Sequence, residues 1–336
     1  MKNILVTGAT GFIGSLLVKE ILDKRMFDNI LLPVRNMNKV TKMYGMVPKH
    51  TGKLHFIESS LMELNSTVLP VDVDYIIHCA SVTQSIEMVT YPVETADSIV
   101  LGTRSILELA RQLSIKSMVY LSSMEVYGRV ADTGRLRGEE ELGELPLEAA
   151  RSCYPLGKRM AEHYCHIYQQ EYRIPVKIAR LAQIFGRGAR VDDGRVFMQF
   201  ARAAYEGRDI ELKTGGASLG NYCASEDAVN AIFTILNKGT DGEVYNVVNE
   251  GNTMSVRDMA GLVARQIAGG RIKVGIGIED PMKNGYAPDT GLRLSGEKLR
   301  EIGWKPTKGL AEMYKDVIFE ICQYQKHFPH KAEKSI

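Results

Sequence analysis

Tyr154 and Lys158 stand four residues apart, at the start of an expected helix. This spacing places both side chains on one helix face, with Cβ atoms about 5–6 Å apart. An ammonium beside a phenol favours the phenolate and lowers a tyrosine pKa that is about 10 in isolation. Such a phenolate can take a proton from a substrate hydroxyl while a hydride leaves for a nicotinamide. The pair therefore predicts dehydrogenase-type chemistry.

A second polar segment, SSMEVYG at 122–128, begins at the carboxyl end of an expected strand. In open parallel sheets, ligands bind beyond these strand ends, so the segment is expected near the tyrosine and the lysine. Glu125 is available there as an acid or base. A non-catalytic dinucleotide sensor would not need a base, which argues against that class of protein.

The first expected strand, 3–7, runs directly into the glycine turn GATGFIG at 8–14. Glycine is needed in such a turn because a Cβ would keep a pyrophosphate away from the backbone amides and the helix N-terminus. The third glycine also lets the helix lie close to the sheet. At the first strand–helix junction of an α/β chain, this turn predicts dinucleotide binding.

The residue that follows the second strand bears on the choice of dinucleotide. NAD usually requires an Asp or Glu there for its ribose hydroxyls, whereas this chain has Arg35, followed by Asn36 and Lys39. A guanidinium suits a 2′-phosphate or stacks on adenine. The sequence therefore favours NADP over NAD, with NAD and an Arg35 that touches nothing left as alternatives.

Strands and helices alternate along the chain with lengths typical of βαβ units on a parallel sheet that is covered on both faces. We expect strands at 3–7, 29–34, 54–58, 74–78, 117–121, 176–180 and 244–248, and helices at 11–24, 93–113, 154–172, 224–236, 256–267 and 309–324. The predicted fold class is α/β, a Rossmann-type doubly wound parallel sheet with a smaller, irregular C-terminal substrate domain. The dinucleotide-binding domain is expected over 1–180, with 221–250 returning to it, and the substrate-binding domain over 181–220 and 251–330.

Composition excludes several classes of partner. The 336 residues include 42 basic and 40 acidic ones, a formal charge of +2, which offers no electrostatic argument for binding nucleic acid or an anionic membrane. No apolar run approaches the roughly 18 residues that a membrane span needs. The five cysteines show neither a CxxC motif nor a metal-binding spacing with histidine. We therefore expect a reduced, cytoplasmic setting and no metal site.

Together with HCAS at 78–81, these motifs resemble, in this order, the extended short-chain dehydrogenase/reductase family, and within it the NAD(P)-dependent nucleotide-sugar epimerase/dehydratase/decarboxylase branch. The resemblance covers nearly the whole chain, including RLAQIFG at 180–186 and LREIGW at 299–304. It implies that the C4 hydroxyl of a nucleotide-diphosphate sugar is oxidised, with epimerisation or decarboxylation to follow. It also implies a homodimer that pairs through the helices at 93–113 and 154–172, which carry apolar residues beyond one stripe.

The resemblance assigns roles to individual residues. Ser123 would hydrogen-bond the reacting oxygen, and Gln183 stands where the family usually has a substrate-contacting Asn. Besides Ser123, the implied catalytic residues are Glu125, Tyr154 and Lys158. The implied cofactor residues are Gly8, Thr10, Gly11, Phe12, Ile13, Gly14, Arg35, Asn36, Ser60, Leu61, Cys79, Ala80, Ser81, Leu121, Tyr154, Lys158 and Leu181. The implied substrate residues are Thr83, Met124, Gln183, Arg195, Val196, Asn221 and Arg293.

The chain departs from the family pattern at positions that bear on the reaction. Met124 precedes Glu125 where the 4,6-dehydratases have an Asp-Glu pair, which disfavours elimination of water. Gly220 stands where the family often has an arginine for the diphosphate, and Ser60 where many relatives use an Asp against adenine. Two other functions stay open: an NADPH-dependent ketoreductase acting on a non-nucleotide carbonyl compound, and a non-catalytic dinucleotide sensor.

Other conspicuous residues are expected to be structural. His78 ends a core strand and is expected to be a hydrogen-bonded wall residue. The acidic run at 139–141 is expected to be a solvated loop face, and Trp304 an anchor for the C-terminal helix.

Overall fold

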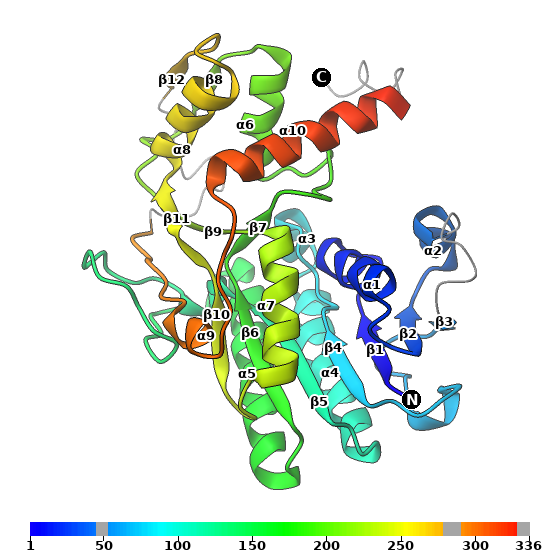
Figure 1. The fold of residues 1–336 in the computed structure, drawn as a ribbon. Helices are drawn as coiled ribbons and strands as arrows, with labels where there is room; N and C mark the ends of the chain where they lie inside the picture. Colours follow the sequence, from blue (N-terminus) through cyan, green and yellow to red (C-terminus); the bar gives the residue numbers. More distant parts are fainter. Residues whose placement is uncertain (45–52, 278–289, 328–336) are drawn as a thin grey trace.

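The computed structural model describes residues 1–44, 53–277 and 290–327 and is built on a parallel sheet of seven strands (Figure 1). From edge to edge the strands are β10 (Val244–Val247), β6 (Val176–Leu181), β5 (Ser117–Ser123), β4 (Tyr75–His78), β1 (Asn3–Thr7), β2 (Asn29–Val34) and β3 (Lys53–Glu58). Every pairing between them is parallel. The predicted doubly wound parallel sheet is confirmed.

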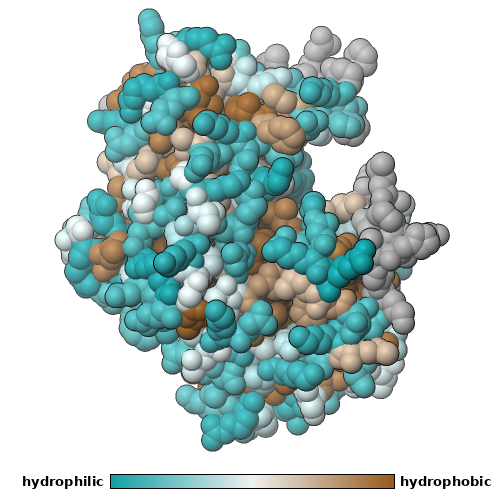
Figure 2. All heavy atoms as spheres, viewed as in Figure 1, coloured by the Kyte–Doolittle hydropathy of each residue, from teal (hydrophilic) through white to brown (hydrophobic). Residues whose placement is uncertain are grey.

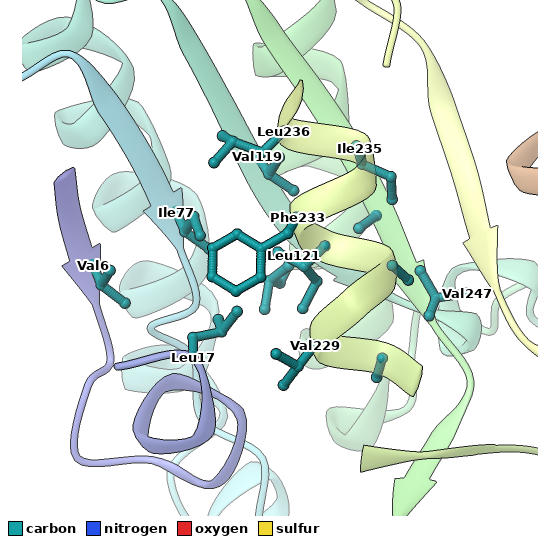
Figure 3. Packing of buried hydrophobic residues seen from close by; sticks show 14 of the residues in the cluster. Val6, Leu17, Ile77, Val119, Leu121, Val229, Phe233, Ile235, Leu236 and Val247 are labelled. Carbon is teal, nitrogen blue, oxygen red and sulfur yellow. The ribbon is translucent and has the colours of Figure 1, made fainter. Parts of the chain in front are cut away.

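Helices cover both faces of this sheet because alternate residues of each strand are apolar on opposite sides. Ile4 and Val6 of β1 belong to one buried core, and Leu5 belongs to the other. The first core lies under α1 (Phe12–Lys24) and α7 (Ser225–Lys238), and the second under α4 (Pro92–Gln112) and α5 (Cys153–Tyr172). In Figure 3, Phe233 of α7, Leu17 of α1 and Ile77 of β4 lie close together between the sheet and the two helices.

A shallow groove of about 440 Å³ runs along the surface between α1 and α7, where Figure 2 shows apolar surface among hydrophilic side chains. Its apolar lining comes from Met26 and Phe233. None of the predicted catalytic or binding residues lines it, and it lies on the face of the sheet opposite α5. The groove is therefore no part of the candidate site.

A further core lies beyond the carboxyl ends of the strands (Figure 1). The helices α6 (Val196–Glu206), α8 (Val256–Leu262) with its π-helical continuation Val263–Ile267, and α10 (Leu310–His327) contribute to it. Two small sheets accompany them, β11 (Asn249–Ser255), β9 (Leu219–Ala224) and β7 (Gln183–Phe185) in one, and β12 (Val274–Ile276) and β8 (Ile210–Leu212) in the other. Phe185 stacks on Phe197 in this core, with 4.5 Å between ring centroids. The domain boundaries drawn from the sequence stay a prediction.

A buried ion pair ties α5 to β6. Arg180 donates to both carboxylate oxygens of Glu162, at 3.0 and 2.7 Å, and to the Tyr127 hydroxyl at 3.2 Å. Tyr127 donates to the side chain of Asn246 at 2.8 Å, and the Asn246 amide donates to Glu139 at 2.9 Å. Glu139 is therefore buried, so the expectation that the acidic run is solvated is wrong for this residue.

The chain returns to the first core just before α10. Trp304 is buried there, and its indole nitrogen donates to the Asp227 carbonyl at 3.0 Å. The Asp227 carboxylate accepts hydrogen bonds from the backbone amides of Thr307 and Lys308, at 2.9 and 3.1 Å. Trp304 therefore fastens the segment that leads into α10 to the first turn of α7.

In the described ranges no helix combines the length and the apolar composition needed to cross a membrane.

Candidate active site

The glycine turn lies at the point where the sheet reverses its strand order. β1 has β2 on one side and β4 on the other, and the chain leaves β1 and β4 in different directions. Gly8 has a φ of +67°, and a Cβ on it would lie 2.8 Å from the Ala80 nitrogen. A Cβ on Gly14 would lie 2.2 Å from the Gly8 carbonyl oxygen. The turn therefore needs glycine and keeps the open backbone that a pyrophosphate requires.

Thr7 joins the two chain turns at this point. Its hydroxyl oxygen accepts from the amides of Cys79 and Ala80, both at 3.1 Å, and lies 2.7 Å from His78 Nδ1. A hydroxyl has one proton, so the geometry assigns it to the bond with Nδ1. The proton of the neutral imidazole is then on Nε2, 3.3 Å from the Thr103 hydroxyl. Burial lowers the His78 pKa to about 3, and the predicted structural role is confirmed.

Tyr154 and Ser123 meet where β5 and α5 approach each other. β5 extends two residues past the predicted strand, so that Ser123 is its last residue. Tyr154 is 7% exposed, and the Ser123 hydroxyl lies close enough to its phenol to lower the Tyr154 pKa. Two groups that could hold one substrate oxygen therefore lie together at the carboxyl edge of the sheet.

Lys158 lies below this pair in a buried position. Its ammonium donates to the Leu121 carbonyl at 2.7 Å and lies 4.8 Å from the ring centroid of Tyr120 and 5.9 Å from that of Tyr154. Burial lowers the Lys158 pKa to about 8, although the Glu162 carboxylate acts in the opposite direction. Sequence reasoning missed Tyr120, although strand alternation places it on the face opposite Leu121, toward α5.

Burial controls the ionisation of Tyr154 and raises its pKa above the usual value. The Glu125 carboxylate raises this pKa further, whereas the hydrogen bond with Ser123 and the guanidinium groups of Arg151 and Arg195 lower it. The lowered tyrosine pKa predicted from the sequence is therefore wrong in this structure, because loss of solvation outweighs the nearby positive charges.

Glu125 forms an ion pair with Arg151. Arg151 Nη2 lies 3.0 Å from one carboxylate oxygen and 2.9 Å from the other, and the guanidinium carbon is 5.7 Å from the ring centroid of Tyr154. Glu125 follows β5 in the 3₁₀ turn Met124–Tyr127, and Arg151 precedes α5 in the turn Ala150–Ser152. Arg151 had no role predicted from the sequence, although a positive charge three residues before Tyr154 was a signal for one.

The adenosine end of the predicted cofactor site lies around the end of β2. Arg35 is exposed and makes no hydrogen bond or ion pair with any residue in the described ranges. Asn36 accepts from the amides of Asn38 and Lys39, at 2.9 and 3.3 Å, and so caps α2 (Met37–Tyr44). Shortly after the end of β3, the Ser60 hydroxyl donates to a carboxylate oxygen of the exposed Glu63 in the same turn, at 2.7 Å.

Tyr44, which the sequence analysis did not single out, reaches from α2 to the glycine turn and donates to the Ala9 carbonyl at 2.7 Å. The other predicted cofactor residues lie at or after the carboxyl ends of β1, β3, β4 and β6, except Leu121, which lies within β5. Most are half-buried: Thr10, Phe12, Ile13, Leu61, Cys79, Ala80, Ser81 and Leu181.

Several predicted substrate residues come from segments around this edge of the sheet. Met124 directly follows β5, and Gln183 lies in β7, half-buried and paired in register with Tyr222 of β9. Arg195 and Val196 lie at the start of α6, and Thr83 lies exposed before α3 (Ser85–Thr90). The Arg195 guanidinium is held by a carboxylate, at 2.7 Å in its ion pair with Asp193. The positive charge of Arg195 lowers the pKa of Tyr154.

The side chain of Asn221 is committed to the protein interior. It is fully buried, donates to the Leu292 carbonyl at 2.9 Å and accepts from the Leu294 amide at 3.0 Å. Arg293 lies between these two residues and has its Nε 3.7 Å from a carboxylate oxygen of Asp132. The structure thus makes Asn221 a support for the strand-like segment that carries Arg293, with no free group for a substrate.

Tyr222 explains why position 220 is glycine. A Cβ on Gly220 would lie 2.2 Å from the Tyr222 hydroxyl oxygen and 2.3 Å from the adjoining ring carbon. The Tyr222 ring is buried and packs edge-on against Phe185, with 5.7 Å between centroids. The ring therefore fills the space that any side chain at position 220 would enter.

Comparisons with known proteins agree with this geometry. The model of the NAD dependent epimerase/dehydratase family matches residues 4–248. The chain is 29% identical, over 98% of its length and 74% of the relative's, to UDP-glucuronic acid decarboxylase 1 of Xenopus tropicalis. It is 30% identical, over 74% of its length and 69% of the relative's, to UDP-glucuronic acid decarboxylase 6 of Arabidopsis thaliana.

Solved structures share the fold. The UDP-glucose 4-epimerase of Thermotoga maritima has a TM-score of 0.80 at 21% identity, covering 96% of this chain and 99% of that one. The UDP-glucuronic acid 4-epimerase of Bacillus cereus, solved with UDP-glucuronic acid and NAD, has a TM-score of 0.78 at 20% identity with the same coverage. At these identities the likeness extends to the fold alone.

The ionisation of His78 predicts a pH dependence of stability. The unfolded chain takes up a proton below a pKa of about 6.5, whereas the folded chain, with a His78 pKa of about 3, does not. The contribution of His78 to stability is therefore fully present above about pH 6.5, and it decreases by about 1.4 kcal/mol per pH unit between there and about pH 3. The unmodified protein should lose free energy of unfolding as the pH is lowered from about 7 to 5. In His78→Asn, which keeps one donor and one acceptor, this loss should be about 2 kcal/mol smaller. Urea unfolding at the two pH values measures this, with the exposed His163→Asn as control; equal pH slopes would contradict the assignment.

Proposed function

The chain belongs to the NAD-dependent epimerase/dehydratase family, and we propose that it oxidises the C4 hydroxyl of a nucleotide-diphosphate sugar and then epimerises or decarboxylates the sugar. The observation that carries this proposal is the meeting of Ser123, Tyr154 and Lys158 at the carboxyl end of β5. The relatives, named as decarboxylases, dehydratases and epimerases of nucleotide sugars, support it. They do not support a single-step ketoreductase or a non-catalytic sensor.

The cofactor is a nicotinamide dinucleotide. The turn built on Gly8, Gly11 and Gly14 would hold the pyrophosphate, because the close backbone contacts at Gly8 and Gly14 require glycine, and glycine leaves the amides of the turn without side chains in front of them. When bound, this cofactor supplies the acceptor for the hydride that leaves the sugar.

The chain's own groups handle the proton of the first step. Tyr154 Oη is placed to take the proton of the C4 hydroxyl, and Ser123 Oγ to hydrogen-bond the same oxygen. Because burial raises the Tyr154 pKa, forming the phenolate needs positive charge nearby. The Lys158 ammonium, 5.9 Å from the Tyr154 ring centroid, supplies such a charge within the buried site.

The second step is assigned to Glu125. Its carboxylate follows Ser123 by two residues, acts on the charge of Tyr154 and is half-exposed toward solvent. It is therefore placed to move a proton at a sugar carbon next to C4. Elimination of water is disfavoured because Met124 supplies no acid. Gln183, Arg195 and Arg293 are proposed to contact the substrate, with Arg195 and Arg293 in place of a cation at position 220.

Tyr154→Phe is expected to abolish turnover while leaving the fold and the cofactor affinity nearly unchanged. The substitution removes the ionisable oxygen but keeps the packing of the buried ring. Steady-state rates with nucleotide sugars, together with cofactor titration and thermal unfolding, measure the three properties. Near-normal turnover would refute Tyr154 as the base.

Glu125→Gln is expected to permit the first step and block the second. Reduced nicotinamide, which absorbs at about 340 nm, should then accumulate when substrate is added. Single-turnover absorbance measurements test this, with Glu141→Gln, from an ion pair elsewhere in the same loop, as the matched control. If Glu125→Gln turns over normally and traps no reduced cofactor, Glu125 does not carry the second step.

We further propose that NADP is preferred over NAD. The support is the exposed Arg35, which has no partner within the described ranges at the end of β2. Arg35→Ala should weaken NADP binding by about 1.5–3 kcal/mol, the scale of a hydrogen bond to a charged group, and barely affect NAD. Calorimetric titration with both cofactors measures the difference, with the exposed Arg104→Ala of α4 as control. Equal losses for both cofactors would instead assign Arg35 to adenine stacking.

A cytoplasmic homodimer is also part of the proposal; all five cysteines are unpaired, in keeping with a reduced setting. The second apolar stripe expected on α4 and α5 is smaller than predicted, because Ile99, Ile106, Leu109 and Tyr168 are buried within the chain. Leu101 and Met160 remain 39% and 40% exposed and support pairing through these helices.

Light scattering is expected to give twice the chain mass of 37.4 kDa at micromolar concentration. The double variant Leu101→Glu and Met160→Glu should shift the protein toward the monomer, since it places charge on the proposed interface. Leu136→Glu, at an exposed apolar position in the loop before α5, should leave the mass unchanged. If the unmodified protein has the mass of a monomer, the dimer is ruled out.

A further inference from the structure

We propose that Arg151 is a positioning residue for hydride transfer: it holds the Glu125 carboxylate beside Tyr154 and offsets the charge of that carboxylate, so that one site can contain both a base and a carboxylate. This role rests on the proposed function, and it concerns a residue outside the Ser123, Tyr154 and Lys158 group.

The geometry connects the two segments that carry the reacting groups. The Arg151–Glu125 ion pair, at 3.0 and 2.9 Å, joins the turn after β5 to the turn before α5. The same guanidinium lies over the Tyr154 ring, 5.7 Å from its centroid. A single guanidinium, that of Arg151, thus contacts both the Glu125 carboxylate and the Tyr154 ring.

A contribution to folding does not account for this pair. The Arg151 and Glu125 side chains are 35% and 39% exposed, and ion pairs this open to solvent add little to stability. The pair between Arg180 and Glu162, by contrast, is buried, with both side chains 5% exposed. The value of the Arg151 pair therefore lies in what it does to its neighbours.

Charged groups reach Tyr154 from several elements, and their signs support the proposal. Glu125 makes the Tyr154 phenolate less favourable, whereas Arg151 and, from the start of α6, Arg195 make it more favourable. Lys158 lies below the ring on α5 itself. The pair also faces the thiol of Cys153, which donates to a carbonyl of α3. A Glu125 without Arg151 would oppose the phenolate with no compensating charge from its own side of the ring.

The test compares Arg151→Met, Arg151→Lys, Glu125→Gln and the double variant Arg151→Met with Glu125→Gln. Arg135→Met is the matched control, because Arg135 pairs with Glu141 in the same loop, away from Tyr154. The first readout is the pH dependence of hydride transfer from nucleotide sugars in a single turnover. The second is a fluorine NMR titration of fluorotyrosine-labelled protein, with and without cofactor, in which Tyr154→Phe identifies the Tyr154 signal.

Arg151→Met should move the acid limb of the rate profile, and the Tyr154 titration, upward by about half a pH unit to one unit. Glu125→Gln should move both downward, and the double variant should lie near the unmodified protein because two opposite charges are lost together. Arg151→Lys keeps the positive charge and should therefore show little of this upward shift, which separates the effect of charge from an effect on folding. Arg135→Met should titrate like the unmodified protein.

The two readouts separate the two proposals. If the unmodified protein transfers no hydride from any nucleotide sugar, the proposed function fails, while the fluorine titration still tests Arg151. If Arg151→Met titrates together with Arg135→Met and the unmodified protein, the positioning role is overturned whatever the substrate is.

Discussion

The close approach of two chain turns at the reversal point of the sheet supports the rest of the site. Gly8 lies so near Ala80 that no side chain fits between them, and Thr7 accepts the amides on the other side of the contact. Through His78 the same hydroxyl is connected to Thr103 of α4. Because α4 packs along α5, this hydrogen-bonded chain connects the glycine turn to the helix pair that carries Tyr154.

Burial gives this site its chemical character and also limits it. Desolvation disfavours the charged forms of both Tyr154 and Lys158, so neither group reaches its reactive state without help from its surroundings. Around these two groups the structure keeps charge in pairs: Glu125 with Arg151, Asp193 with Arg195, and Glu162 with Arg180. Because each of these charges has an opposite partner, the region around Tyr154 and Lys158 gains little net charge from them.

Local patterns predicted the elements that position the site. The strand at 29–34 was found as predicted, and the glycine turn and the YxxxK pair lie where strand–helix alternation placed them. Contacts between distant segments could not be predicted in this way. Glu139 is buried, and it accepts a hydrogen bond from Asn246, more than a hundred residues away in the sequence. The glycines between 186 and 220 predicted loops, so α6 and the small sheet that contains β9 were not predicted. The raised pKa of Tyr154 likewise depends on burial, which residue spacing does not report.

The packing of Tyr222 over Gly220 constrains how this chain can change over evolutionary time. A Cβ at position 220 would come within 2.2 Å of the Tyr222 hydroxyl oxygen, so any larger residue introduced there first meets a filled space. Only after position 222 has become smaller can position 220 gain a side chain without displacing the core around Phe185. A variant of this chain with a cation at position 220 would therefore need either a smaller residue at position 222 or a Tyr222 ring displaced from its present place.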